Sequence, residues 1–334
     1  MPLLAIDQIK TVGLAGAGAV GFGWAALLLA RGYQVVATDP AEDAKSRLRA
    51  AVNDRWPALV RLGVATTDRP PIDALRFVRS LEEMAAASDL VQENAPEGPE
   101  VKRAVISTID SVLRPECLIL SSSGGVPPSV MQSYCKHPER LLLGHPFHPA
   151  HIVPLVEVVG GDRSTPEAVD IALQFYRRLG KHPIHLKKEK VGHLSNRLQF
   201  ALLREACNCL ASGVASAEDI DAAMRWGLGP RWALMGSLMT FNLAGGEGGL
   251  ESLLNRFADD IQKWWDSLEA TELTPEVRAS LVEGARQIGA GISNREWELW
   301  RDNALIDFFQ FRSTHPYPTD TKQSQAVSPQ QTSL

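Results

Sequence analysis

The sequence predicts an α/β protein with an N-terminal, doubly wound and mostly parallel sheet, followed by an all-helical C-terminal domain. Up to about residue 188, short apolar runs alternate with helical patterns, and this alternation is typical of strands joined by crossover helices. Beyond about residue 190 the apolar periodicity is helical almost throughout. We therefore expect domains at 1–188 and 189–312, and a polar, proline-containing tail at 313–334 that stays disordered.

The strands of the first half are short runs rich in apolar and β-branched residues. "KTVGLAG" at 10–16 precedes an apolar helix over about 20–31, and "YQVVATD" at 33–39 precedes a charged helix. Further helices are expected at 97–112 and 165–180. The remaining strand-like runs lie at 89–95, 116–123, 140–147, 154–160 and 182–187.

The second half opens with two helical segments, "SNRLQFALLREACNCLASG" and "SAEDIDAAMRWG". Ser216, followed three residues later by Asp219, has the form of a capping box with Asp in place of the usual Glu. "GGEGG" at 245–249 interrupts the pattern. Additional helices are then predicted at about 250–268, 274–290 and 294–312.

Length and charge exclude several classes of protein. A chain of 334 residues suggests two domains. The 34 basic and 39 acidic side chains give a net charge of −5, which argues against a nucleic-acid partner or an anionic membrane surface. No apolar run reaches the roughly 20 residues that span a bilayer. Four cysteines without a C-x-x-C pair argue against a disulfide framework or a zinc knuckle. We expect a cytoplasmic protein, although the final Thr332-Ser333-Leu334 faintly resembles a peroxisomal address.

"GAGAVG" at 16–21 fits the pattern G-x-G-x-x-G between a strand and a helix. Gly16 allows the tight turn, Gly18 lets the backbone approach a pyrophosphate, and Gly21 lets helix and strand pack closely. Asp39 ends the next strand, where an acid can bind ribose hydroxyls. Pro40 follows it in place of an arginine, so NAD is preferred over NADP. The alternative is a glycine-rich turn with an N-capping Asp; the context favours a Rossmann-like dinucleotide site.

"GHPFHPAHIVPLVEVV" at 144–159 contains His145, His148 and His151. Their spacing converges on one face only in a helix, and the interleaved prolines rule a continuous helix out. We therefore expect no metal site. Glu157 lies in an apolar strand, where an unpaired carboxylate is costly, so a strand-end histidine is its expected partner. A carboxylate bonded to one ring nitrogen fixes the tautomer, and the other nitrogen can then act as a base. The alternative is a buried pair that only stabilises the fold.

These motifs, together with "ENAPEGPEVK", "SNRLQFALLREA" and "SAEDIDAAMRWGLGPRWALMG", resemble the 3-hydroxyacyl-CoA dehydrogenase superfamily. The branch that this chain resembles most is the λ-crystallin, L-gulonate 3-dehydrogenase and carnitine dehydrogenase group. The resemblance covers about residues 8–245 in consistent order. It implies a Rossmann-like domain, a helical domain used in homodimerisation, and an active site between the two.

The resemblance also implies roles for particular residues. His145 would be the general base, Glu157 its partner and Asn196 a polar residue on the substrate side. The residues implied in NAD binding, besides the three glycines, are Ala19, Val20, Asp39, Glu97 and Lys102. From the residues alone, Glu97 and Lys102 open a helix and could equally form a surface ion pair.

Two departures from the relatives bear on the chemistry. Gly124, in "SSSGG", stands where relatives carry a serine that approaches substrate and nicotinamide, and His148 stands where they carry an asparagine. Either Ser122 or Ser123, together with His148, compensates on the substrate side, or the substrate and chemistry differ.

Three functions remain open on this basis. The first is an NAD-dependent dehydrogenase that interconverts a 3-hydroxy acid or 3-hydroxyacyl substrate and its 3-oxo form. The second is a repurposed relative in a specialised biosynthetic pathway that catalyses a non-redox proton transfer, such as an aldol reaction, cyclisation or elimination. The third is a crystallin-like structural protein that retains a cofactor site. The intact His145, Glu157 and Asn196 argue against the third.

Overall fold

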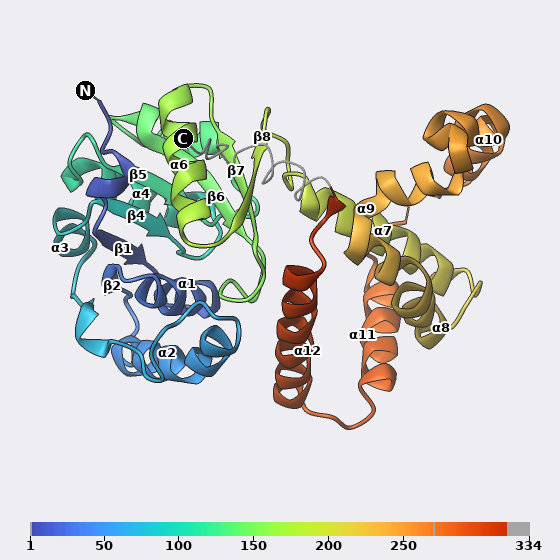
Figure 1. Ribbon diagram of the computed structural model, residues 1–334, viewed down its shortest axis with the longest axis horizontal. Coiled ribbons are helices and arrows are strands. Elements are labelled where there is room, and N and C mark those ends of the chain that lie inside the picture. Colours follow the sequence, from blue (N-terminus) through green and yellow to red (C-terminus); the bar gives the residue numbers. More distant parts are fainter. Residues whose placement is uncertain (1, 270, 319–334) are drawn as a thin grey trace, which may run out of the picture. The chain divides into compact units, whose positions relative to one another are not determined.

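The computed structural model describes residues 2–269 and 271–318 (Figure 1). By its internal contacts the chain divides into two units. The first consists of the chain up to Arg197 together with Leu299–Phe311, and the second of Leu198–Glu298 and the chain from Arg312 on. Residues 319–334, most of the predicted tail including its final Thr-Ser-Leu, lie outside the described residues.

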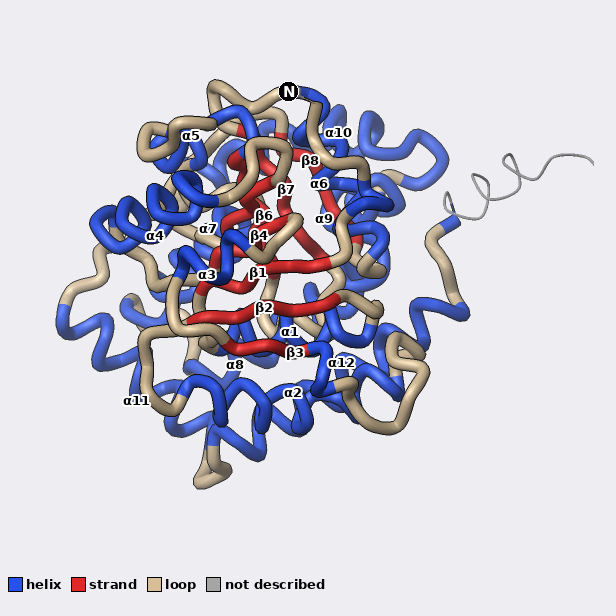
Figure 2. Tube along the Cα trace, turned by 90° about the vertical axis from the view of Figure 1, so that its left-hand side faces the viewer, coloured by secondary structure: helices blue, strands red, loops and turns tan. Residues whose placement is uncertain are grey.

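The first unit is built on an eight-stranded sheet of order β3-β2-β1-β4-β5-β6-β7-β8 (Figure 2). All neighbouring strands are parallel except β6 and β7, which are antiparallel. The strands are β1 Thr11–Ala15, β2 Gln34–Thr38, β3 Leu75–Phe77, β4 Leu90–Glu93, β5 Leu118–Ser121, β6 Leu141–Pro146, β7 Leu155–Gly160 and β8 His182–Leu186. The predicted doubly wound fold is therefore confirmed, with β3 as a strand that the sequence pattern did not predict.

Helices cover both faces of this sheet, which explains why the strands read as continuous apolar runs. Leu118 and Leu120 of β5 join one buried cluster, whereas Ile119 between them joins the other, because successive side chains alternate between faces. The first cluster packs under α1 Ala19–Ala30, α2 Ala44–Arg61 and α6 Pro166–Arg178. The second packs under α3 Leu81–Ala86, α4 Pro99–Val112 and α5 Pro128–Gln132.

In the second unit, every secondary-structure element among the described residues is a helix. Ser216 caps α8 by accepting a hydrogen bond from the Asp219 N–H, and its hydroxyl lies 2.7 Å from the Asp219 carboxylate. The Ser216 N-cap is thus present, but the Asp219 carboxylate bonds the Ser216 hydroxyl and not its backbone N–H, so the predicted capping box is formed only in part. The helices are α7 Ser195–Ala211, which begins in the first unit, α8 Ala217–Ala223, α9 Gly229–Ala244, α10 Gly249–Asp266, α11 Pro275–Gly289 and α12 Asn294–Thr314. Within the described ranges, no helix is both long and apolar enough to cross a membrane.

A part of α12 belongs to the first unit. Arg61, at the end of α2, forms an ion pair with Asp307 at 2.7 Å and a hydrogen bond with Asn303. Gln310 donates a hydrogen bond to the Arg61 carbonyl at 2.6 Å. The first unit is therefore discontinuous in sequence.

Candidate active site

The glycine loop between β1 and α1 has the features that a dinucleotide requires. Gly16 has φ +98°, and a Cβ there would lie 2.8 Å from the Asn94 carbonyl oxygen. A Cβ at Gly21 would lie 2.2 Å from the Gly16 carbonyl oxygen, so both positions exclude a side chain. Gly18 is different, because a Cβ built on it meets nothing within 4 Å. It is also the N-cap of α1, and no side chain caps the helix there. This combination leaves an open, positively polarised helix end that fits a pyrophosphate.

Asp39 directly follows β2 and faces the same loop. Its carboxylate accepts hydrogen bonds from the Ala17 N–H at 2.7 Å and from the Ala41 N–H at 3.0 Å. A carboxylate has about four lone-pair positions, so it keeps capacity for ribose hydroxyls. β1 and β2 are parallel neighbours, and their carboxyl ends bring the glycine loop and Asp39 together. The residues fit NAD.

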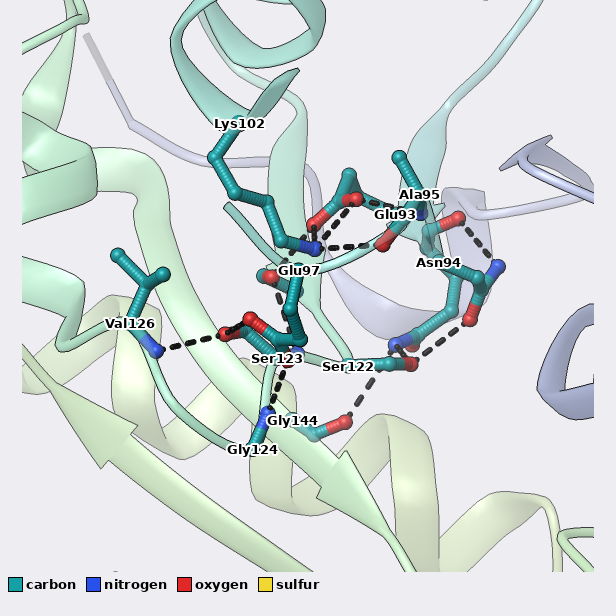
Figure 3. A network of polar contacts seen from close by, with 12 residues as sticks. Glu93, Asn94, Ala95, Glu97, Lys102, Ser122, Ser123, Gly124, Val126 and Gly144 are labelled. Carbon is teal, nitrogen blue, oxygen red and sulfur yellow. Dashed lines mark hydrogen bonds and ion pairs between the residues drawn. The ribbon is translucent and has the colours of Figure 1, made fainter. Parts of the chain in front are cut away.

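Lys102 and Glu97 lie near the carboxyl ends of the strands but do not pair with each other (Figure 3). Lys102 is 1% exposed, and its ammonium lies 2.8 and 2.9 Å from the two carboxylate oxygens of Glu93 and 2.9 Å from the Ala95 carbonyl. The surface-pair interpretation is therefore wrong. Glu93, which the sequence pattern did not single out, is fully buried and also accepts the Ser121 hydroxyl. This buried ion pair fixes the end of β4 beside the glycine loop.

Glu97 holds the loop after β5, as Figure 3 shows. It accepts the Gly124 N–H at 2.7 Å and the Ser123 hydroxyl at 2.9 Å. The Ser123 hydroxyl in turn accepts the Val126 N–H at 2.9 Å. These contacts give the backbone at Gly124 a defined position.

Ser122 is also bound within the protein. Its hydroxyl donates to Asn94 at 2.7 Å and accepts from Gln92 at 2.8 Å and from the Trp24 indole at 3.3 Å. Both predicted substrate-side serines, Ser122 and Ser123, thus use their hydroxyls to hold the site together.

The antiparallel pairing of β6 and β7 sets His145 opposite Glu157. His145 Nδ1 lies 3.0 Å from Glu157 Oε2, with the His145 side chain 12% exposed and Glu157 fully buried. The other oxygen, Oε1, accepts hydrogen bonds from Leu194 N–H at 3.1 Å, from Ser195 N–H at 2.8 Å and from the Ser195 hydroxyl at 3.0 Å. Burial alone would raise the pKa of Glu157, but the hydrogen bonds from His145 and Ser195 outweigh it and lower the pKa. Glu157 is thus held as a carboxylate against Nδ1.

Gly124 lies between the other nitrogen of His145 and the side chain of Asn196. A Cβ built on Gly124 would lie 3.2 Å from His145 Nε2 and 3.5 Å from the Asn196 side-chain nitrogen. Gly124, His145, Glu157 and Asn196 all belong to the first unit. The structure therefore brings the three predicted catalytic residues together and sets Gly124 among them.

The other two histidines of the motif have different surroundings. His148 is exposed in the connection between β6 and β7. His151 is 5% exposed, and burial, together with the charge of Arg55, lowers its pKa to about 3. Across residues 2–269 and 271–318, no three or more His, Cys, Asp or Glu side chains come together in a way that could hold a metal ion.

Two residues of this site carry no prediction from the sequence. His193 is 2% exposed, and its ring centroid lies 5.3 Å from that of His145. Ser195 supplies two of the hydrogen bonds to Glu157. Only their proximity to Asn196 in "GHLSNRL" could have indicated them.

A mostly parallel sheet with an open glycine loop and an acid at the next strand end defines the class: this is an NAD-dependent oxidoreductase. The chain matches the family model "3-hydroxyacyl-CoA dehydrogenase, NAD binding domain" over residues 11–190 and "3-hydroxyacyl-CoA dehydrogenase, C-terminal domain" over residues 192–277. It belongs to the 3-hydroxyacyl-CoA dehydrogenase family.

Curated relatives include L-carnitine dehydrogenases. The chain is 41% identical to that of Bacillus cereus over 304 residues, covering 91% of this chain and 93% of the relative. It is 46% identical to that of Nocardiopsis dassonvillei over 300 residues, covering 90% and 91%.

Solved structures of the same fold were also found. One is 5-formyl-3-hydroxy-2-methylpyridine 4-carboxylic acid 5-dehydrogenase, described as an NAD+ dependent dismutase. It has a TM-score of 0.74 and 28% identity, covering 91% of this chain and 98% of that one. Another, (S)-3-hydroxybutyryl-CoA dehydrogenase from Ralstonia eutropha, has a TM-score of 0.62 and 25% identity, covering 85% and 95%.

Proposed function

We propose that this protein is an NAD-dependent dehydrogenase that interconverts a 3-hydroxy acid or 3-hydroxyacyl substrate and its 3-oxo form, with His145 as the general base. The observation that carries the proposal is the buried Glu157 carboxylate 3.0 Å from His145 Nδ1, with both His145 Nε2 and the Asn196 amide facing Gly124. The family and the NAD domain support it.

The chemistry follows from the arrangement of the pair. Glu157 accepts the Nδ1–H of His145, so the lone pair resides on Nε2 and takes the proton of the substrate hydroxyl. The carboxylate then stabilises the imidazolium. NAD supplies the hydride acceptor, so the carbinol loses one hydride and one proton and becomes a carbonyl. Asn196 is positioned to hydrogen-bond the substrate oxygen.

The cofactor residues divide into three groups. We propose that Gly16, Gly18, Gly21 and the N–H groups of Ala19 and Val20 bind the pyrophosphate. Asp39 would bind the adenosine ribose. Glu97 and Lys102 would act by shaping the walls of the site through the Gly124 loop and Glu93.

We propose a free 3-hydroxy acid of the carnitine type as the first substrate to test, because the relatives over most of the chain are L-carnitine dehydrogenases. The experiment follows NADH absorbance with L-carnitine, D-carnitine, a set of unbranched 3-hydroxy acids and 3-hydroxybutyryl-CoA. His145→Ala is the matched control, expected to lose turnover while binding NAD as wild type does. NAD binding without turnover on any of these substrates would contradict the proposal.

A second candidate function rests on Gly124. No side chain is present at this position beside His145 Nε2, and the hydroxyls of Ser122 and Ser123 are bound elsewhere. The His–Glu pair could therefore serve a non-redox proton transfer, such as an aldol reaction, cyclisation or elimination. Exchange of substrate α-protons with D₂O, followed by NMR without NADH formation, would favour this function.

We also propose a homodimer formed through the second unit. Among its described residues this unit leaves large apolar side chains exposed, including Trp226 at 82% and Leu238 at 74%. Light scattering after size exclusion tests the dimer, and a monomer at micromolar concentration would contradict it.

We also propose a cytoplasmic location and the domain limits 1–188 and 189–312. Imaging of a fusion with a free C-terminus distinguishes the cytoplasm from peroxisomes.

A further inference from the structure

His193 lies at a strained point of the chain just before α7. Its backbone has φ +52°, in the left-handed region that only a few per cent of residues other than glycine adopt, histidine more often than most. Its Nε2 lies 3.1 Å from the Ser123 carbonyl oxygen. Because a carbonyl only accepts hydrogen bonds, Nε2 carries the proton and Nδ1 keeps its lone pair. Nδ1 is buried and has no hydrogen-bond partner in the described part of the chain. A left-handed backbone and a buried nitrogen without a hydrogen-bond partner both lower the free energy of unfolding. Residues with such features are found most often at functional sites.

His193 joins the loop after β5 to the segment before α7, and a second contact joins that segment to α5, the helix that follows the loop. The second joins Glu189 to Ser129, whose N–H and hydroxyl lie 2.5 and 2.6 Å from the two carboxylate oxygens. The same segment supplies the N–H groups of Leu194 and Ser195 to Glu157. The His193–Ser123 contact therefore links the Gly124 loop to the segment that holds the Glu157 carboxylate, and the Glu189–Ser129 contact links the following helix α5 to the same segment.

We propose that His193 is a positioning residue that fixes the backbone at Gly124 relative to His145. This inference rests on the proposed function, in which His145 Nε2 is the base. A Cβ on Gly124 would lie only 3.2 Å from Nε2, so the loop backbone itself borders the place where the substrate hydroxyl must lie. A shift of this loop changes the room beside the base, and small misplacements of reacting groups are costly to rate.

The protonation of His193 agrees with this role. Burial lowers its pKa, partly opposed by the hydrogen bond to the Ser123 carbonyl. The ring is therefore neutral near pH 7, where it donates from Nε2 and adds no positive charge next to His145. It acts through the loop and has no part in proton transfer.

Three variants test the contact. His193→Phe keeps an aromatic ring but has no donor. His193→Asn suits the left-handed backbone but is too short to reach Ser123, so it remains informative if the Phe variant does not fold. His193→Gln is the matched control, because its amide nitrogen reaches about as far as Nε2 and its backbone strain equals that of Phe.

The first measurement is amide hydrogen exchange at Gly124 and Val126, whose N–H groups are bonded within the loop. We expect exchange to rise about fivefold to tenfold in the Phe and Asn variants, the size of one net hydrogen bond. The Gln variant is expected to stay within about twofold of wild type. Unchanged exchange in Phe and Asn, or an equal rise in all three, would overturn the inference.

The second measurement is steady-state kinetics. We expect kcat to fall about tenfold in the Phe and Asn variants while the Kd for NAD stays within about twofold, with kcat restored in Gln. A loss of NAD affinity equal to the loss of kcat would indicate a merely structural residue and overturn the inference. If wild-type protein turns over no hydroxy acid, the proposed function fails, whereas the exchange measurement still decides whether His193 fixes the loop.

Discussion

Glu157→Gln changes one buried atom of the His145 pair. In wild type, Oε2 accepts Nδ1–H at 3.0 Å and Oε1 accepts the contacts from Leu194 and Ser195. A glutamine can keep its carbonyl oxygen toward Leu194 and Ser195, and then presents its NH₂ group to Nδ1. His145 must reverse its tautomer to accept that hydrogen bond, which places the proton on Nε2 and removes the base.

The magnitude follows from the charge that disappears. When His145 takes a proton, the imidazolium and carboxylate charges are centred about 4 Å apart, and at an effective dielectric constant of about 20 they attract by about 4 kcal/mol. This corresponds to about a thousandfold in kcat. We expect Kd for NAD to change less than about twofold, because Glu157 does not contact the glycine loop.

NADH formation under saturating substrate measures the loss, and intrinsic fluorescence measures NAD binding. Ser195→Ala is the control, since it removes one donor from Oε1 but keeps the carboxylate; we expect a loss of about tenfold or less. A Glu157→Gln variant that retains a tenth or more of wild-type kcat would refute the reasoning, as it would show that the charge on Glu157 does not support the base.

Three further outcomes are expected. Gly18→Ala should keep the melting temperature near that of wild type but weaken NAD binding by about tenfold or more, because its Cβ enters the open space where the phosphate would bind. Gly16→Ala, at φ +98°, should lower the melting temperature as well. Equal melting temperatures of the two variants would contradict this expectation. The buried ammonium of Lys181 donates hydrogen bonds to the carbonyls of Ala150 and Val153 in the connection between β6 and β7. Lys181→Met removes this donor and should lower the free energy of unfolding by about 2 kcal/mol in urea titrations; a loss below about 0.5 kcal/mol would argue against it. His151 has a folded pKa of about 3 against an ordinary value of 6.5, so between these values the unfolded chain binds the extra proton and stability falls as pH falls. His151→Phe should remove about 1 kcal/mol per pH unit of this slope below pH 6, and an unchanged slope would show that another group is responsible.

Long helices with a clear period and apolar strands of four to six residues were predictable from the sequence, whereas β3 and α3 were not. α4, α10 and α11 begin and end within two residues of their predicted bounds. β3 has three residues and α3 has six, which is too few for an apolar period to stand out from the surrounding chain. The sequence alternation also gives no direct signal for the antiparallel β7. The connection of eight residues between β6 and β7 is the physical reason, because a parallel crossover needs about a dozen or more.

The candidate site divides in a similar way. The glycine loop and Asp39 follow local rules, so the sequence indicates them directly. The His145–Glu157 contact was predictable from the cost of burying a carboxylate in an apolar strand. The partner of Lys102 and the contact of His193 depend on segments that meet only in the folded chain.

The register of β6 on β7 has a consequence for insertions and deletions. His145 and Glu157 share a face of the sheet because they are directly paired in an antiparallel ladder. The connection at 147–154 can therefore change in length without affecting the pair, provided that the two strands keep their alignment. A slip of one residue would turn Glu157 to the opposite face and leave a buried carboxylate without its histidine. Insertions at the exposed His148 should accordingly be tolerated while the strands keep their alignment, whereas changes that displace Ala150 or Val153 would also lose the hydrogen bonds from Lys181.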